Sequence, residues 1–233
     1  MRESPVAERN PWDRPPLARQ GNGSDRALFE SIGRALNAWE QIESELAHLY
    51  SAFLTGDRFD LPANLAYGVL NTSPLRLAGL QRVAKAHWVQ HPSQDIEGEF
   101  ERLSEMVDRY SARRNDIAHG IARPFQWIVA PNLEGLIMIP TRDSTWCLIP
   151  PHYRPKTEPG TYPAYLLTSR EINAFGAVFL NVAHALSNLS LWVTRHVPVQ
   201  SGGIRHTLGS LPHIVPVPRI LRGQRRPAPS SLE

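Results

Sequence analysis

The chain has 233 residues, of which 42% are apolar, 21 are proline and one is cysteine. This length and apolar fraction suit a single domain with a substantial core and short appendages. A disulfide scaffold is excluded, because Cys147 has no second cysteine within the chain. We therefore expect a reducing, cytoplasmic setting, and the prolines and charges of the first residues do not suit a secretory signal.

The formal net charge of +3 is distributed unevenly, since the excess of arginine lies near the two ends of the sequence. Residues 25–197 carry a formal charge of −2. Nucleic-acid-binding domains usually present a basic folded face, because neutralising phosphates supplies much of their affinity. The central region does not show that overall charge.

The two ends of the sequence are rich in proline and poor in large apolar side chains. Such segments bury too little surface to offset their ordering entropy, so residues 1–24 and 198–233 are expected to be disordered. The Pro/Arg-rich C-terminal tail has two interpretations, a solvated tail or a contact with RNA or an acidic partner. The region between them, 25–197, is expected to form one helical domain.

The first expected helix is about seven turns long. Its apolar residues alternate steps of three and four, which lines one face of a helix. Ser24 or Asp25 can cap its start and Gly56 can end it. The apolar positions are Leu28, Ile32, Leu36, Trp39, Ile42, Leu46, Leu49 and Phe53.

Two further helical regions follow. Residues 64–90 are helical in composition but broken near Ser73-Pro74, because proline disfavours helical geometry in the residue before it. We expect a short helix and then a longer one. The next helix has the most regular spacing, with Ile96, Phe100, Leu103, Val107, Tyr110, Arg114, Ile117 and Ile121 on one face.

Arg114 is the one charged residue in that apolar series. A long cationic side chain can leave a core-facing position by extending its charged end to solvent. Alternatively, the position faces an anion site or a partner subunit, where a bound phosphate or carboxylate offsets the burial of the guanidinium.

The pattern after Gly120 changes to alternation with a period of two. Strands are predicted at 125–129, 136–139 and 146–149, with a turn at 132–135 and residues 162–167 as a candidate further strand. Many prolines keep these strands short. We expect 124–167 to be a small antiparallel β insertion that covers one end of the helical bundle.

The last helix is predicted to begin at Thr168, because Thr168 and Glu171 have the spacing of a capping box. Residues 172–194 contain no charged residue, so a transmembrane interpretation must be weighed. The segment carries several asparagines and His184, which are costly in lipid. We therefore expect a buried helix of a soluble bundle, with no membrane.

The most concentrated group of reactive residues is the segment 113–120, Arg-Arg-Asn-Asp-Ile-Ala-His-Gly. An arginine five positions before a histidine is expected about once by chance in this composition. Requiring asparagine directly after the arginine lowers that expectation to roughly 0.04. Arg114, Asn115 and His119 satisfy the stricter pattern.

Arg114-Asn115-x-x-x-His119 resembles the R-N-x-x-x-H signature of the HEPN superfamily. The resemblance implies a mainly α, HEPN-like helical bundle, often a homodimer, and in many members a metal-independent endoribonuclease of toxin or antiviral-defence type. It implies an RNA substrate, catalytic roles for Arg114, Asn115 and His119, no cofactor, and an antitoxin or regulatory protein as a partner. The strand-rich stretch 124–167 departs from the minimal bundle.

Helix geometry supports a site shared by two chains. Asn115 and His119 are four residues apart on one face, so the amide can orient the imidazole. Arg114 lies about 140° from His119 on an ideal helix, so one chain does not easily bring both to one phosphate. Two antiparallel copies of this helix would bring both pairs into one cleft.

The proposed chemistry is attack of a ribose 2′-hydroxyl on the adjacent phosphate, which leaves a cyclic phosphate end. His119 moves the proton, and its place before Gly120 at the end of a helix favours the imidazolium. Arg114 binds the phosphoryl oxygens and stabilises developing charge. Arg113, Asp116 and Tyr110 are candidate binding or supporting residues.

The alternative is a non-catalytic HEPN-like dimeric module that binds a nucleotide, RNA or a protein. In that interpretation Arg114 pairs within the chain with Glu43 or Glu45, and His119 caps a helix end. Glu43 is also the candidate supporting partner of the motif. No metal site is expected, because the histidines lack paired cysteines or clustered carboxylates.

Overall fold

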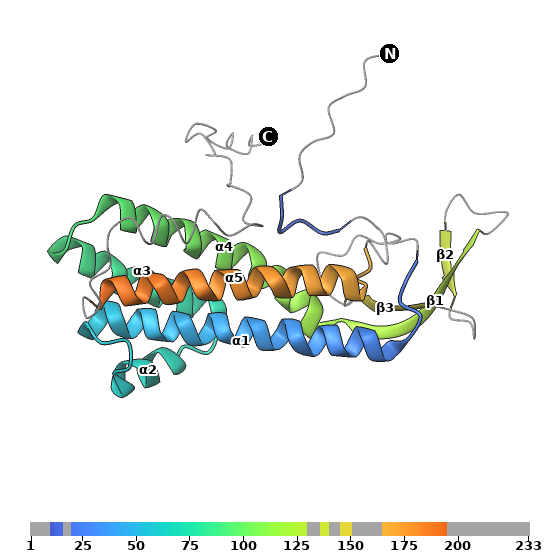
Figure 1. Cartoon of the computed structure of the whole chain (residues 1–233), viewed down its shortest axis with the longest axis horizontal. Coiled ribbons are helices and arrows are strands. Elements are labelled where there is room, and N and C mark those ends of the chain that lie inside the picture. The colour runs from blue at the N-terminus through green and yellow to red at the C-terminus, as the bar shows by residue number, and fades with distance from the viewer. Residues whose placement is uncertain (1–9, 16–19, 130–135, 140–144, 151–164, 195–233) are drawn as a thin grey trace, which may run out of the picture.

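The structure is a computed structural model that describes residues 10–15, 20–129, 136–139, 145–150 and 165–194. Within these residues, Figure 1 shows a bundle of long helices, α1, α4 and α5, with α2 and α3 toward one end and a small sheet at the other. The expected mainly α fold with an antiparallel insertion before the last helix is confirmed.

α1 spans Asp25–Thr55, close to the bounds expected from its apolar spacing. Gly56 ends it with a left-handed φ of 78°, and the Gly56 N–H donates to the Ala52 carbonyl at 3.0 Å. Ser24 is the residue before the first turn, but its side chain makes no capping hydrogen bond. The predicted start and end of this helix are confirmed.

The region after α1 contains the expected short helix and the expected longer one. α2 spans Leu61–Gly68 and α3 spans Ser73–Gln90. Each has a proline in its first turn and a side chain that caps its start. Asp60 accepts from the Ala63 N–H at 2.8 Å, and Thr72 accepts from the Leu75 N–H at 3.4 Å.

α4, Gln94–His119, leads directly into β1, Ile121–Val129, through Gly120. β2, Leu136–Ile139, and β3, Thr145–Ile149, pair antiparallel with β1 on its two sides, giving the order β2-β1-β3. β3 pairs with residues 121–125 of β1, whereas β2 pairs with residues 126–129. Pro124 therefore lies where β1 has one neighbour, a position that tolerates proline.

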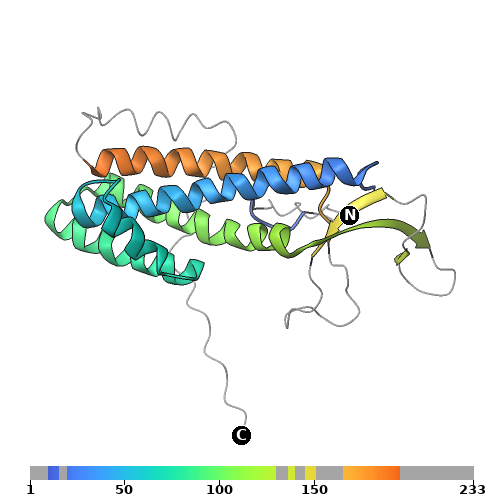
Figure 2. The ribbon, with the colours of Figure 1, turned by 90° about the horizontal axis from the view of Figure 1, so that it is seen from below.

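The sheet lies at the end of the bundle where α1 and α5 begin and α4 finishes, as Figure 2 shows from a second direction. Leu148 of β3 also forms a bridge with Leu167, just before α5. The predicted strands and their position over one end of the bundle are confirmed. The predicted turn at 132–135 and most of the candidate strand at 162–167 lie outside the described residues.

α5 spans Ser169–Val193 and begins with the capping box that the sequence indicates. The Glu171 carboxylate accepts from the Thr168 backbone N–H at 2.9 Å. By length and hydropathy alone this helix is able to cross a membrane, but half of its most apolar window is buried inside the bundle. Its burial against α1 and α4 is what a core helix of a bundle requires.

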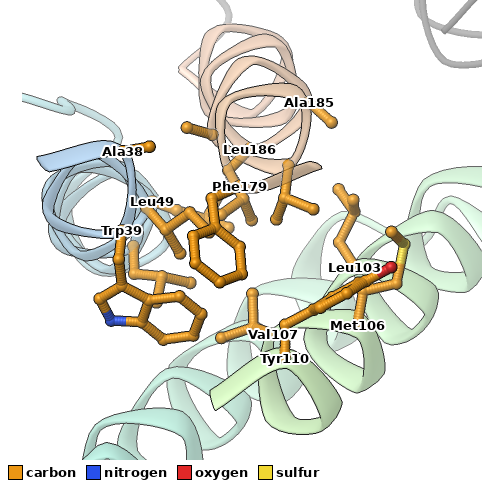
Figure 3. Packing of buried hydrophobic residues seen from close by; sticks show 14 of the residues in the cluster. Ala38, Trp39, Leu49, Leu103, Met106, Val107, Tyr110, Phe179, Ala185 and Leu186 are labelled. Carbon is orange, nitrogen blue, oxygen red and sulfur yellow. The ribbon is translucent and has the colours of Figure 1, made fainter. Parts of the chain in front are cut away.

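The core forms where α1, α4 and α5 meet. Figure 3 shows Trp39, Tyr110 and Phe179, one from each helix, pointing toward one another. The Phe179 ring packs edge-on at 5.2 Å from Trp39 and 6.0 Å from Tyr110, measured between ring centroids. Such pairs stabilise a core beyond the area that they bury.

α1 and α5 also approach closely along their length. A Cβ at Gly176 would lie 3.3 Å from the Ala35 Cα, so two small residues face each other at this crossing. This close contact fixes α5 against α1. The final turns of α4 lie at the end of the bundle that carries the sheet.

The N-terminal segment differs from the expected disordered tail where the structure describes it. Trp12 packs edge-on against Tyr110 at 6.2 Å between ring centroids, and Arg14 lies 5.0 Å from the Tyr165 ring centroid. Asn22 exchanges backbone hydrogen bonds of 2.7 Å with Trp146. The expectation overlooked how much surface one indole buries. Residues 1–9, 16–19 and 195–233 lie outside the described residues.

Candidate active site

The final turns of α4 carry the sequence motif, and consecutive residues face in different directions because each step turns about 100°. Arg114, Asn115 and His119 lie toward the surface, whereas Arg113 and Asp116 are buried. The structure therefore brings the three expected catalytic residues to one rim of the bundle.

Arg114 extends across the surface toward α1. Its side chain is 32% exposed, and its Nη2 lies 3.7 Å from a carboxylate oxygen of Glu40, which is itself 66% exposed. That separation is longer than a hydrogen bond, so the contact is a weak, solvent-screened ion pair. Its Nη1 donates to the Asn115 Oδ1 at 3.2 Å.

The guanidinium of Arg114 keeps unused donors in this arrangement. One of the four N–H donors on its two Nη atoms is taken by Asn115, whereas its Nε–H is buried, has no hydrogen-bond partner among the described residues, and does not face solvent. A guanidinium presents its donors in a planar fork that matches two phosphate oxygens. Arg114 is thus available for an oxyanion without loss of a strong internal ion pair.

Asn115 takes a different partner from the one expected. Its side-chain oxygen accepts from Arg114, and the described residues show no hydrogen bond between Asn115 and His119. The four-residue spacing still places Asn115 and His119 on the same side of α4. In this arrangement the amide positions the guanidinium rather than the imidazole.

His119 is the last residue of α4 and is exposed. Gly120 fixes where the helix ends, because a Cβ there would lie 2.6 Å from the Leu148 Cγ and 2.8 Å from the Asp116 carbonyl oxygen. The sheet therefore packs directly under the residue that presents the imidazole.

Arg113 and Asp116 form a buried pair behind the motif. Arg113 Nη2 lies 3.0 Å from Asp116 Oδ2, and the two side chains are 8% and 7% exposed. The Arg113 guanidinium also lies 5.7 Å from the Tyr165 ring centroid. Burial and a hydrogen bond with Asp116 raise the pKa of Tyr165 above its usual range. This cluster supports α4 from the core side.

Tyr110, another candidate supporting residue, belongs to the core. It is 2% exposed and packs against Trp12, Phe175 and Phe179. Burial raises the pKa of Tyr110 to about 12. Its hydroxyl is therefore a neutral, buried group, and the residue contributes packing one turn before Arg114.

Glu43 lies one turn along α1 from the residue that meets Arg114. Its carboxylate accepts from Arg76 Nη1 at 2.8 Å and from the Trp39 indole N–H at 3.2 Å. Arg76 also donates to the Leu70 carbonyl, so Glu43 ties the start of α3 to α1. The acid beside Arg114 is Glu40, rather than the expected Glu43 or Glu45; Glu45 pairs with Arg58 at 2.8 Å.

Among the described residues, no three His, Cys, Asp or Glu side chains gather in a way that could hold a metal ion. The site consists instead of a partly exposed guanidinium, an exposed imidazole and an amide on one helix end. The chain matches no protein-family model, no curated protein and no solved structure.

Proposed function

We propose that the protein is a metal-independent, HEPN-like endoribonuclease of toxin or antiviral-defence type that acts as a homodimer. The observation that carries the proposal is the open rim at the end of α4. There an exposed His119 and a weakly paired Arg114 occur in the R-N-x-x-x-H pattern. The neighbouring Arg113 is buried and pairs with Asp116 instead.

A dimer supplies the geometry that one chain lacks. Along one ideal helix Arg114 and His119 are separated by about 7.5 Å of rise and about 140° of rotation. An isologous contact between two α4 ends places His119 of one protomer beside the partner subunit's Arg114. Each of the two equivalent sites then holds one imidazole and one guanidinium around a single phosphate.

In the proposed reaction the ribose 2′-oxygen forms a bond to the adjacent phosphorus while the bond to the 5′-oxygen breaks. His119 accepts the 2′-hydroxyl proton, and the leaving 5′-oxygen takes a proton from the resulting imidazolium. Arg114 binds the phosphoryl oxygens, whose negative charge grows as the new bond forms. The products are a 2′,3′-cyclic phosphate and a 5′-hydroxyl.

A second function is favoured by two contacts of the same residues. Glu40 places a carboxylate next to Arg114, which competes with a phosphate, and Asn115 contacts Arg114 rather than His119. These contacts suit a non-catalytic dimeric module that binds a nucleotide, RNA or a protein at the same rim. An antitoxin or regulatory protein is a suitable partner in either case.

The test is to incubate the purified full chain with single-stranded RNA in excess EDTA. His119→Ala is expected to lower the cleavage rate by about 10²–10⁴-fold and Arg114→Ala by about 10²–10³-fold. His184→Ala and Arg34→Ala are matched controls, because both residues are exposed and lie on other helices. Intact RNA at high wild-type concentration would overturn the nuclease and leave the binding module.

A further inference from the structure

A groove between α3 and α4 lies apart from the residues of the site above. Its volume is about 580 Å³. The α3–α4 groove is lined from α3 by Leu77, Gln81, Lys85 and Trp88, and from α4 by Glu97, Phe100, Glu101, Ser104, Glu105 and Asp108.

The groove has an apolar floor and an acidic wall. Leu77, Trp88 and Phe100 supply the apolar surface. The four carboxylates of α4 recur at steps of four, four and three, so they follow one edge of the groove for about 16 Å. Lys85 is the one lysine or arginine in the lining, and Arg109 pairs with Glu105 at 3.6 Å along the rim.

Trp88 is the largest apolar side chain of the groove floor. Its side chain lines the groove although the residue is 7% exposed. Its indole N–H has no hydrogen-bond partner among the described residues. Because that nitrogen is itself enclosed, Trp88 offers the groove apolar ring surface rather than a hydrogen-bond donor.

The chain itself carries a segment of complementary chemistry. Residues 195–233 contain six arginines and one glutamate. Between residues 214 and 226 apolar and basic residues alternate in short groups. The apolar residues are Ile214, Val215, Val217, Ile220 and Leu221, and the basic ones are Arg219, Arg222, Arg225 and Arg226.

The last described residues of α5 lie near the α3–α4 groove. Trp192, in the last turn of α5, lies 6.4 Å from Trp88 between ring centroids. The chain therefore leaves α5 beside one end of the groove. The nineteen residues between Thr194 and Ile214 can span up to about 65 Å, which is several times the length of the acidic wall.

We infer that residues 214–226 bind within the α3–α4 groove of the same chain. The apolar side chains cover the floor, and the arginines face the carboxylates of α4. The inference does not rest on the proposed nuclease activity. It assigns the basic tail to an acidic surface of its own domain rather than to RNA.

The experiment uses the full chain with a nitroxide attached through Ser230→Cys. Cys147 is fully buried and burial raises its pKa to about 12, so the label reacts with the introduced thiol. At low salt the amide signals of Gln81, Lys85 and Ser104 are expected to broaden. Sharp signals at all three amides would overturn the inference.

Charge reversal tests the acidic wall. Glu101→Lys/Glu105→Lys is expected to abolish the broadening, and adding Arg222→Glu/Arg225→Glu is expected to restore it. Asp25→Lys/Glu30→Lys makes the same charge change on the exposed start of α1 and should leave the broadening intact. Broadening that persists after the α4 reversal, or in 0.5 M salt, would contradict recognition by charge.

A mixing experiment distinguishes binding of the tail within one chain from binding of the tail of a second copy. Isotope-labelled chains without nitroxide are combined with unlabelled chains that carry it. The inference predicts sharp groove signals in this mixture. Broadened groove signals there would identify the tail of a second copy as the occupant and would overturn binding within one chain.

Discussion

Arg113 and Arg114 are consecutive in the sequence and have opposite environments. Arg113 is buried, lies 3.0 Å from Asp116 and packs over Tyr165. Arg114 is one-third exposed and meets an exposed carboxylate at 3.7 Å. One step of 100° around α4 separates a side chain that stabilises the fold from one that is free to bind an anion.

The largest difference expected between the two arginines is in stability. Arg113→Ala leaves the Asp116 carboxylate buried without its cationic partner and is expected to lower the free energy of unfolding by about 3–5 kcal/mol. Arg114→Ala removes a weak surface pair and is expected to cost less than about 1 kcal/mol. Urea denaturation of both variants measures this difference, and equal losses would contradict the two assigned environments.

Gly120 links the end of α4 to β1. Gly120→Ala places a Cβ against Leu148 and the Asp116 carbonyl, so it is expected to lower the free energy of unfolding by about 1–3 kcal/mol. Gly33→Ala is a matched control, because a Cβ at that helical position meets nothing within 4 Å. Thermal denaturation compares them, and a neutral Gly120→Ala would show that the sheet does not hold the end of α4.

Cys147 tests the packing beneath that helix end through its pH dependence. Burial raises the pKa of the folded thiol from 9.0 to about 12, so above pH 9 the unfolded chain loses this proton and the folded chain retains it. The free energy of unfolding is therefore expected to fall by about 1.4 kcal/mol per pH unit from pH 9 upward. Cys147→Ala should remove this contribution, so its slope between pH 9 and 10 should be shallower than that of the wild-type chain; the slope that remains comes from buried tyrosines such as Tyr110, whose pKa is also raised. An unchanged slope would mean that the thiol ionises freely.

The smallest expected change in stability is at Glu40, which lies beside the exposed Arg114. Glu40→Gln removes the carboxylate beside Arg114 and is expected to change stability by less than about 0.5 kcal/mol. RNA affinity should rise by a few fold at low salt, since the guanidinium no longer has an internal competitor. Filter binding measures it with Glu30→Gln as the control, and weaker binding would assign Glu40 a direct role in holding the ligand.

The elements of the fold that depend on local sequence could be predicted. The left-handed Gly56, the capping box at Thr168 and Glu171, and Pro74 in the first turn of α3 each act within a few residues. Apolar spacing likewise identified the faces of α1 and α5 and most of that of α4, but Ile121, predicted on the face of α4, lies in β1 and is 38% exposed. These signals depend on the period of one helix and need no knowledge of its neighbours.

The contacts of the candidate site depended on how helices pack against one another, which spacing does not specify. Glu40 and Glu43 lie three residues apart on one helix face, and either one suits Arg114 by sequence. The axial position of α1 relative to α4 brings Glu40 to Arg114, and Arg76 of α3 pairs with Glu43. Trp12 was missed for a similar reason, because its partner Tyr110 is distant in the sequence.

The most direct test of the account asks whether Arg114 and His119 from different protomers form one RNA-cleaving site. Arg114→Ala and His119→Ala chains are each purified, mixed, dissociated and allowed to re-form dimers before RNA is added with EDTA. Mixed dimers hold one complete site, so the account predicts recovery to roughly a quarter of wild-type activity, since about half of randomly re-formed dimers are mixed. A mixture that stays as inactive as either variant, while wild-type chains treated in the same way cleave RNA, would contradict a site shared between protomers.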